Sequence, residues 1–206
     1  MRQADNDLKT PIRTLTVATM LFSSSITDTF AGSFAQIDVA EDSKTLIFAT
    51  KAGDWNLAAV ASDWGDGELY SASAVKNVIA ASEQQPFNLG LGIALSQKIY
   101  DEDGEDDSQG IGLKAVIDSY QTHDWGNSFW LAEYVTTDNN WLLMTQLLPS
   151  NTAFGLQLTA VGDDSYSGQS MALLYRLENT PWTLRTGVQH DSDDTKLFIG
   201  ASYNTF

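Results

Sequence analysis

The sequence contains no cysteine, which excludes a disulfide framework and any thiolate metal site. Histidine occurs only twice, at His123 and His190. No run of about 18 uninterrupted apolar residues occurs, so a transmembrane helix is excluded as well. Basic residues are scarce, because 11 Lys and Arg stand against 27 Asp and Glu and leave a formal net charge of −16. That balance argues against nucleic acid as a partner and against docking on anionic lipid through a basic patch.

The first 31 residues have the order of a secretory signal peptide. Basic residues come first, a largely apolar stretch follows over 14–26, and small residues precede a predicted cut after Ala31. A cut after Ala35 is the second option. Two aspartates in the basic region leave a cytosolic amphipathic helix as the alternative. We therefore expect a signal peptide over 1–31 and a single domain over 32–206.

The rest of the chain alternates with a period of two rather than 3.6. In the stretch 87–100, Leu91 and Ile93 fall on one face, while Gly92 and Ala94 fall on the other. Successive side chains of a strand point to opposite faces, so this segment has one apolar side and one side of small or polar residues. About twelve such strands are predicted, near residues 33–41, 44–51, 54–63, 68–79, 87–100, 111–120, 128–137, 141–149, 154–161, 170–177, 182–190 and 195–203.

The connections between these segments alternate in charge. Acidic connections such as "DEDGEDDSQG" alternate with less acidic ones such as "LPSNT", which in an up-and-down meander emerge at opposite ends. We therefore predict an all-β fold, an antiparallel up-and-down transmembrane β-barrel of about 10–12 strands in the cell outer membrane. A secreted soluble β-sandwich that binds a ligand is the alternative, because its strands alternate too. A helix over the alanine-rich residues 71–82 is a local alternative.

Aromatic residues cluster at the ends of the predicted strands, as expected for interfacial girdles. They include Trp55, Trp64, Tyr70, Phe87, Tyr100, Tyr120, Trp125, Trp141, Phe154, Tyr175, Trp182 and Tyr203. The chain itself ends on Phe206. Together with Tyr203, this residue resembles the C-terminal insertion signal that the barrel-assembly machinery of Gram-negative bacteria reads. The two aromatics are three positions apart instead of the usual two, so either a bulge near Asn204 realigns them or the ending is atypical.

The segment "WGNSFWLAEY", residues 125–134, resembles the "GNSF…L…EY" stretch of the YfaZ family of small outer-membrane proteins. The order of features over residues 38–137 is similar as well. "EDSKTLIFATKAGDWNLA" leads into an Asp/Gly loop, and a hairpin with an acidic tip follows. The resemblance implies a location and an architecture. It implies no catalytic residue, because the family has no established activity.

The polar residues do not predict catalysis. His190 stands beside Asp191, Ser192 and Asp193, but neighbouring residues of a strand point to opposite faces, so this linear cluster is poor evidence for a catalytic triad. His123 is interpreted as a turn residue. An outer-membrane enzyme acting on lipid or polysaccharide is kept as an alternative. It requires one of the two histidines to share a pocket with a serine and a carboxylate.

The acidic tip over residues 101–107 carries oxygen ligands of the kind that calcium prefers. Asp101, Asp103, Asp106 and Asp107 are weak candidates for such a site. Their spacing does not fit an EF-hand loop, so a solvated acidic loop is the favoured interpretation and no cofactor is expected.

Seven charged residues are predicted to face the lumen, namely Lys98, Lys114, Asp118, Arg176 and Arg185, with Lys76 and Glu133 grouped beside them. Charges inside a narrow barrel must be paired or hydrated, so they form either a salt-bridged core or the lining of a small pore. We expect a small monomeric barrel with a structural or surface-interaction role, or a narrow channel, and no enzymatic activity. The expected partners are outer-membrane lipid and lipopolysaccharide, and the barrel-assembly machinery during insertion.

Overall fold

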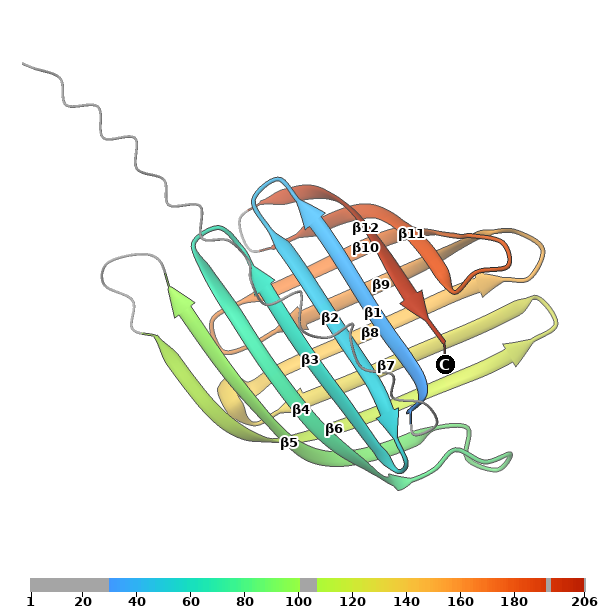
Figure 1. Ribbon diagram of the computed structural model, residues 1–206, viewed down its shortest axis with the longest axis horizontal. Coiled ribbons are helices and arrows are strands. Elements are labelled where there is room, and N and C mark those ends of the chain that lie inside the picture. The colour runs from blue at the N-terminus through green and yellow to red at the C-terminus, as the bar shows by residue number, and fades with distance from the viewer. Residues whose placement is uncertain (1–29, 101–106, 192–193, 206) are drawn as a thin grey trace, which may run out of the picture.

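The computed structural model describes residues 30–100, 107–191 and 194–205, which form a closed antiparallel barrel (Figure 1). Most of the predicted signal peptide lies outside the described residues. The strands are β1 (Phe30–Ala40), β2 (Lys44–Ala52), β3 (Trp55–Asp63), β4 (Gly67–Ile79), β5 (Asn88–Tyr100), β6 (Ser108–His123), β7 (Gly126–Val135), β8 (Asn140–Pro149), β9 (Phe154–Gly162), β10 (Ser167–Arg176), β11 (Trp182–His190) and β12 (Thr195–Asn204), with a 3-10 turn η2 (Thr137–Asn139) between β7 and β8. The predicted up-and-down barrel is confirmed, with twelve strands.

Each strand pairs with its neighbours in sequence, and β1 closes the barrel by pairing with β12. The closing seam runs from Phe34 opposite Asn204 to Ala40 opposite Phe198. Closure leaves no unpaired strand edge, which is the condition for placing β-structure in hydrocarbon. The helical alternative over residues 71–82 is wrong, because β4 covers most of that segment and is paired on both sides.

The outward face of the barrel is apolar and exposed. On β12, Leu197 and Ile199 are 77% and 69% exposed, while Phe198 between them is 4% exposed and faces the lumen. On β6, Ile111 and Leu113 are similarly exposed on either side of the buried Gly112. A water-soluble sandwich turns its apolar face inward, so this inverted pattern excludes the sandwich alternative and fits a wall in contact with acyl chains.

Large aromatic side chains ring both ends of this apolar band. At the end that carries the β10–β11 turn they pack in pairs: Trp182 meets Tyr203 at 5.2 Å and Phe154 meets Tyr175 at 5.2 Å between ring centroids. At the other end Tyr134 stands opposite Trp141 on the outward face. Tyr100, predicted for the girdle, instead has the inward phase of β5, where it packs edge-on against Trp64 at 6.1 Å. Two such girdles are typical of barrels whose rims lie at the two membrane–water interfaces. Among the described residues, no helix is long and apolar enough to cross a membrane.

Alternate connections emerge at opposite ends of the barrel. The acidic end comprises the connections β1–β2, β3–β4, β5–β6, β7–β8, β9–β10 and β11–β12. The acidic residues described at this end include Asp42, Asp66, Asp107, Asp138, Asp163, Asp164, Asp191 and Asp194. The opposite end carries the other five turns, and its acidic residues are Asp54, Glu83, Asp124 and Glu178. The predicted charge asymmetry between the rims therefore follows from the strand order.

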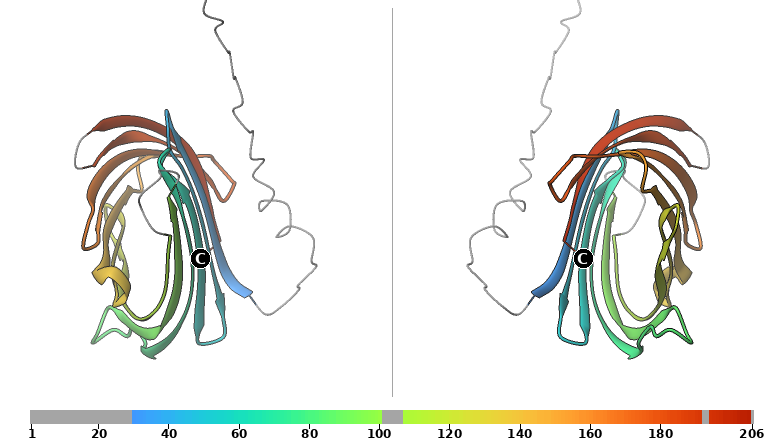
Figure 2. Two further views of the ribbon diagram at one scale, coloured as in Figure 1. Left: turned by 90° about the vertical axis from the view of Figure 1, so that its left-hand side faces the viewer. Right: turned by 90° about the vertical axis from the view of Figure 1, so that its right-hand side faces the viewer.

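The barrel is flattened, with β2–β4 on one long side and β8–β10 on the other (Figure 2). The two halves of the inner wall differ in packing. Inward residues of β9–β12 are buried, among them Gln157, Ala172, Leu174, Arg185, Phe198 and Ser202. Most inward residues of β2–β4 are only half-buried. They include small residues, Ala49, Ala58, Ser62, Ser71 and Ser73, and larger apolar ones, Ile47, Val60 and Leu69. One side of the lumen is thus filled by buried side chains, and the other is less densely packed.

Candidate functional site

A polar network fills the lumen beside the packed wall. Arg185 on β11 makes two hydrogen bonds with the Asp38 carboxylate on β1, at 2.9 and 3.2 Å. The Arg185 Nη1 also donates to the Gln157 Oε1 on β9 at 2.9 Å, and Gln36 donates to Asp38 at 2.7 Å. A bidentate guanidinium–carboxylate pair is the strongest arrangement for two buried charges, and the two amides satisfy acceptor and donor positions that the pair leaves over.

Gly200 on β12, the strand between β11 and β1, leaves room for the contact between Arg185 and Asp38. In the strand register Arg185 stands opposite Gly200 of β12, and Gly200 stands opposite Asp38 of β1. A Cβ at position 200 would collide with the Asp38 carboxylate and with the backbone of Ile37. The absence of a side chain at Gly200 therefore lets a residue of β11 reach a residue of β1 across the strand between them.

A second ion pair joins β6 and β7 on the inner wall. Lys114 lies 2.7 Å from the Glu133 carboxylate and 3.5 Å from the Ser73 hydroxyl on β4. Toward the opposite end, Asp118 accepts a hydrogen bond of 2.8 Å from Asn88 on β5. Each charge therefore has a partner in a place where an unpaired charge is costly.

The third ionic group lies at the acidic end and joins strands that are not neighbours in the barrel wall. Lys98 on β5 contacts Asp163, which follows β9, at 2.7 Å, and Asp138 in the β7–β8 turn at 3.4 Å. Three strands lie between β5 and β9 around the barrel, so the Lys98–Asp163 contact crosses the mouth of the lumen. The Lys98 and Asp163 side chains are only 14% and 8% exposed.

Asp163 is held in its charged form. Burial by itself raises the pKa of this carboxyl, but hydrogen bonds from Lys98 and from the backbone and hydroxyl of Ser165 outweigh it and bring the pKa below its ordinary value. The Oδ1 accepts from the backbone N–H groups of Ser165 and Tyr166 at 2.8 and 2.9 Å, while the Oδ2 accepts from Lys98. Asp163 thus both shapes its own turn and anchors the lysine.

The β7–β8 turn bends over the inner face of β6. Asp138 and Asn139 have positive φ angles of 54° and 48°, a conformation that Asp and Asn tolerate better than most residues. The turn is tied to the β9–β10 turn, because the Asp164 N–H donates to the Asp138 carbonyl at 3.0 Å and Asn139 donates to the Asp164 carboxylate at 2.9 Å. Thr137 lies directly over Gly110 of β6, where any side chain would meet it.

The remaining predicted lumen residues lie near the opposite end. Arg176, at the end of β10, donates to the backbone carbonyls of Pro149 and Thr152, so it braces the β8–β9 turn. Lys76 was expected on the inner face, and this expectation is wrong. Val75 takes the inward position, and Lys76 stands outward opposite Trp55, at the strand end where a long cationic side chain can reach the interface.

The structure describes only part of the acidic tip that was considered for calcium. Asp101, Asp103 and Asp106 lie outside the described residues, and Asp107 accepts a hydrogen bond from the Tyr100 N–H at 3.1 Å. Within the described ranges no group of three or more His, Asp or Glu side chains is arranged to hold a metal ion.

The two histidines make separate hydrogen bonds with hydroxyl groups. His190 lies 2.9 Å from the Thr195 hydroxyl, and His123 lies 2.8 Å from the Ser128 hydroxyl while it stacks on Trp125 at 4.9 Å. The His123 and Ser128 pair spans the tight β6–β7 hairpin, which agrees with the interpretation of His123 as a turn residue.

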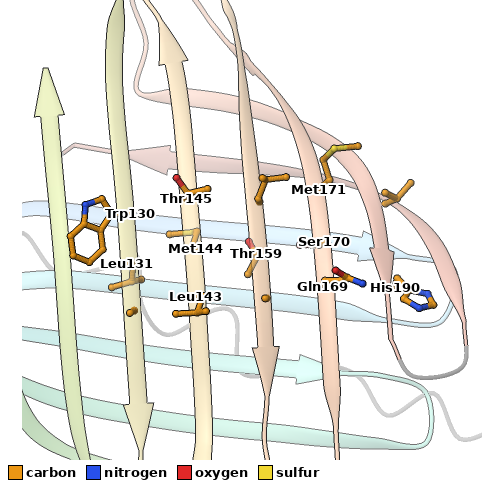
Figure 3. Close-up of a pocket in the computed structure, with 14 residues that line it drawn as sticks. Trp130, Leu131, Leu143, Met144, Thr145, Thr159, Gln169, Ser170, Met171 and His190 are labelled. Atoms are coloured by element: carbon orange, nitrogen blue, oxygen red, sulfur yellow. The ribbon is translucent and has the colours of Figure 1, made fainter. Parts of the chain in front are cut away.

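His190 also lines a cavity of about 740 Å³ on the outer wall, with Trp130 at its far side (Figure 3). Its lining is formed mainly by apolar side chains of β7–β11, such as Leu158 and Met171. No Asp or Glu is among the described residues that line it. Ser170 is near, but it stands opposite the inward Gln189, whereas His190 faces outward, so the two side chains lie on different faces of the sheet. The cavity therefore lacks the grouping that a hydrolase triad needs.

Tyr203 lies on the outward face of β12, against Trp182. Pairing between β1 and β12 is regular through Asn204, so no bulge occurs in this part of the strand. Phe206 lies outside the described residues, and the predicted insertion signal stays a prediction.

The barrel's strand number, closure and flattened shape allow a comparison with known structures. The chain is similar in fold to the KdgM porin. Two structures of that porin, one of them in complex with disordered oligogalacturonate, superpose with TM-scores of 0.55 and 0.54 at 10% identity, and each alignment covers 84% of this chain and 98% of the porin. The outer-membrane protein Omp33 of Acinetobacter baumannii is similar too, with a TM-score of 0.50, 9% identity, and coverage of 85% and 97%. The outer-membrane barrel predicted from the sequence is thus confirmed at the level of the fold.

Sequence comparisons add no family to this fold. No family model matches the chain, and no curated protein matches it. The resemblance to the YfaZ family therefore stays a prediction, and the structural likeness to KdgM rests on fold rather than on shared residues.

The sequence interpretation missed the acidic and amide partners of the lumenal bases. Asp38, Gln36 and Gln157 were not selected, although each occupies the inward phase of its strand beside exposed apolar residues. Asp138 and Asp163 lie in turns, where no periodic signal exists. A search for polar residues at inward positions would have found the first group but not the second.

Proposed function

We propose that this protein is a narrow channel for small solutes in the cell outer membrane. The observation that carries the proposal is the unequal filling of the lumen. Most inward residues on the β2–β4 side, such as Ser71 and Ser73, are only half-buried, while packed side chains fill the β9–β12 side. A twelve-stranded barrel is narrower than the porins of about sixteen strands, which fits a restricted passage along one wall.

The expected surroundings follow from the same geometry. The exposed apolar band contacts membrane lipid, and the acidic end faces lipopolysaccharide. We propose that the chain works as a monomer after insertion by the barrel-assembly machinery. The likeness to the KdgM porin supports a channel, and the oligogalacturonate of that complex illustrates one class of solute that a barrel of this fold accommodates.

A planar-bilayer experiment tests the proposal. The purified barrel, folded in detergent and checked by heat-modifiable gel mobility, should give stepwise currents in KCl. Ser71 faces the lumen from the middle of β4 and Ala72 faces outward beside it. Ser71→Trp should reduce the unit conductance by at least about half, because an indole fills a narrow passage, while Ala72→Trp should leave it unchanged. A folded barrel that gives no currents, or equal conductance in both variants, contradicts the channel along this wall.

A further inference from the structure

The acidic end of the lumen is narrowed by a group that we term the clasp. It consists of Lys98, Asp163 and the β7–β8 turn, residues 136–139. Lys98 reaches from β5 across the mouth to Asp163 at 2.7 Å and to Asp138 at 3.4 Å. The turn lies over the lumenal side of Gly110 on β6 through Thr137. The clasp thus connects β5 to the β7–β8 and β9–β10 turns across the mouth of the lumen.

The clasp carries an excess of negative charge. Lys98 contacts two carboxylates, and Asp164 is joined to the same turn through Asn139. Within the clasp one positive charge is therefore matched by two negative ones, and the neighbouring Asp164 adds a third. The Asp138 side chain is 42% exposed, so its charge is available to an ion that passes.

The other lysines and arginines that point into the barrel from the same half of the wall are already paired. Arg185 is held by Asp38, Lys114 by Glu133 and Lys196 by Asp42 at 2.9 Å. A passing anion would have to displace an internal carboxylate to reach any of these three cations, whereas a passing cation meets exposed carboxylate oxygen at Asp138.

We propose that the clasp is the selectivity element of the channel, and that it makes small cations pass in preference to anions. This inference rests on the proposed channel function and names its substrate class. Charged side chains at a constriction act at short range and in a region of low dielectric, so a small excess of one sign decides which ion enters. The preferred solutes are therefore unlike the polyanion in the KdgM complex.

Reversal potentials in a KCl gradient across a planar bilayer test the inference. The wild-type barrel should prefer K⁺ over Cl⁻. Asp138→Asn removes an exposed carboxylate but leaves the Lys98–Asp163 pair in place, and should lower the K⁺/Cl⁻ permeability ratio at least about twofold. Asp124→Asn, in the β6–β7 turn at the opposite end, removes a charge that is also exposed and should leave the ratio close to that of the wild type.

A second variant tests whether the clasp also sets the width. Lys98→Met removes the cation that joins the two sides, so the turn should move away and the unit conductance should rise. A reversible lock separates this movement from the change of charge. A Cβ built on Gly110 lies 3.6 Å from the Thr137 Cβ, which suits a disulfide, and the native chain has no cysteine to interfere. In Lys98→Met carrying Gly110→Cys and Thr137→Cys, oxidation should restore low conductance and reduction should raise it again.

The possible outcomes distinguish a failure of the selectivity inference from a failure of the proposed channel function. A barrel that conducts but prefers Cl⁻, or whose selectivity is equal in Asp138→Asn and Asp124→Asn, overturns the inference and leaves the channel standing. Conductance that is the same in the oxidised and reduced lock overturns the role of the turn in setting the width. A folded barrel that stays silent in every variant overturns the channel function, and the inference fails with it.

Discussion

Arg185 and Asp38 lie 147 positions apart in the chain, yet two hydrogen bonds of 2.9 and 3.2 Å join them inside the barrel. The pair bridges the seam at which the last strands meet the first, because β12 lies between β11 and β1. The contact therefore reports on closure itself: it forms only when β1 and β12 are paired in the observed register.

Removal of one partner should destabilise the closed barrel. Arg185→Met leaves the buried Asp38 carboxylate without its cation, and breaking such a pair on one side typically costs about 3–5 kcal/mol. We expect the variant to lose heat-modifiable mobility at a lower temperature, or at a lower urea concentration, than the wild type. Arg185→Met combined with Asp38→Leu should recover part of the loss. A single variant as stable as the wild type would show that the pair does not contribute to closure.

Gly200 should be as important to this contact as the charged residues. Gly200→Ala places a Cβ where the Asp38 carboxylate lies, so the ion pair has to move or open. We expect destabilisation of about 1–3 kcal/mol, the usual range for overpacking, by urea titration of the folded barrel in detergent micelles. Ala201→Val, at the next position but on the outward face, is the matched control and should change stability by less than about 0.5 kcal/mol.

The sequence predicted the wall of the barrel well because a strand has a fixed period. The alternation of Leu197, Phe198 and Ile199 assigns each side chain to a face, and the exposed fractions agree with that assignment. Lys76 was misassigned for a related reason. Val75 points inward, so the next residue of the strand, Lys76, points outward. It had been assigned to the lumen from its charge alone.

The sequence did not predict the partners of the lumenal charges. A contact such as Lys98 to Asp163 depends on how far the barrel is flattened and on how two turns bend inward, and neither property has a periodic signal. The bend at Asp138 and Asn139 left only a weak trace, since Asp and Asn tolerate positive φ in many turns of other kinds. The site at the acidic end therefore emerged only from the three-dimensional arrangement.

Acid should loosen the clasp. The Asp163 pKa is lowered from its ordinary value of 3.8 in the folded protein, so its ionic contribution is fully present above that value and is lost as the pH falls through the lower, folded pKa. We expect the unit conductance of the wild type to be constant from about pH 7 to pH 5 and to rise below about pH 3.8.

Two variants isolate this acid response from the titration of the other carboxylates. In Asp163→Asn the clasp lacks its main anion at every pH, so conductance should already be high at neutral pH. Lys98→Met should behave in the same way, because it removes the other side of the contact. If both variants still show the full rise in acid, the response originates elsewhere in the acidic end.

A charged residue should destabilise the barrel more on the outward face of β5 than on its inward face. Leu95 is 48% exposed toward the lipid, and the next residue, Ser96, points into the lumen. Leu95→Arg places a guanidinium in hydrocarbon near the middle of the strand, which should cost about 2–4 kcal/mol in a bilayer. Ser96→Arg should cost clearly less, because the lumen offers water and polar neighbours. The measurement is reversible unfolding of both variants in lipid vesicles. Equal losses would mean that the face carrying Leu95 does not contact acyl chains.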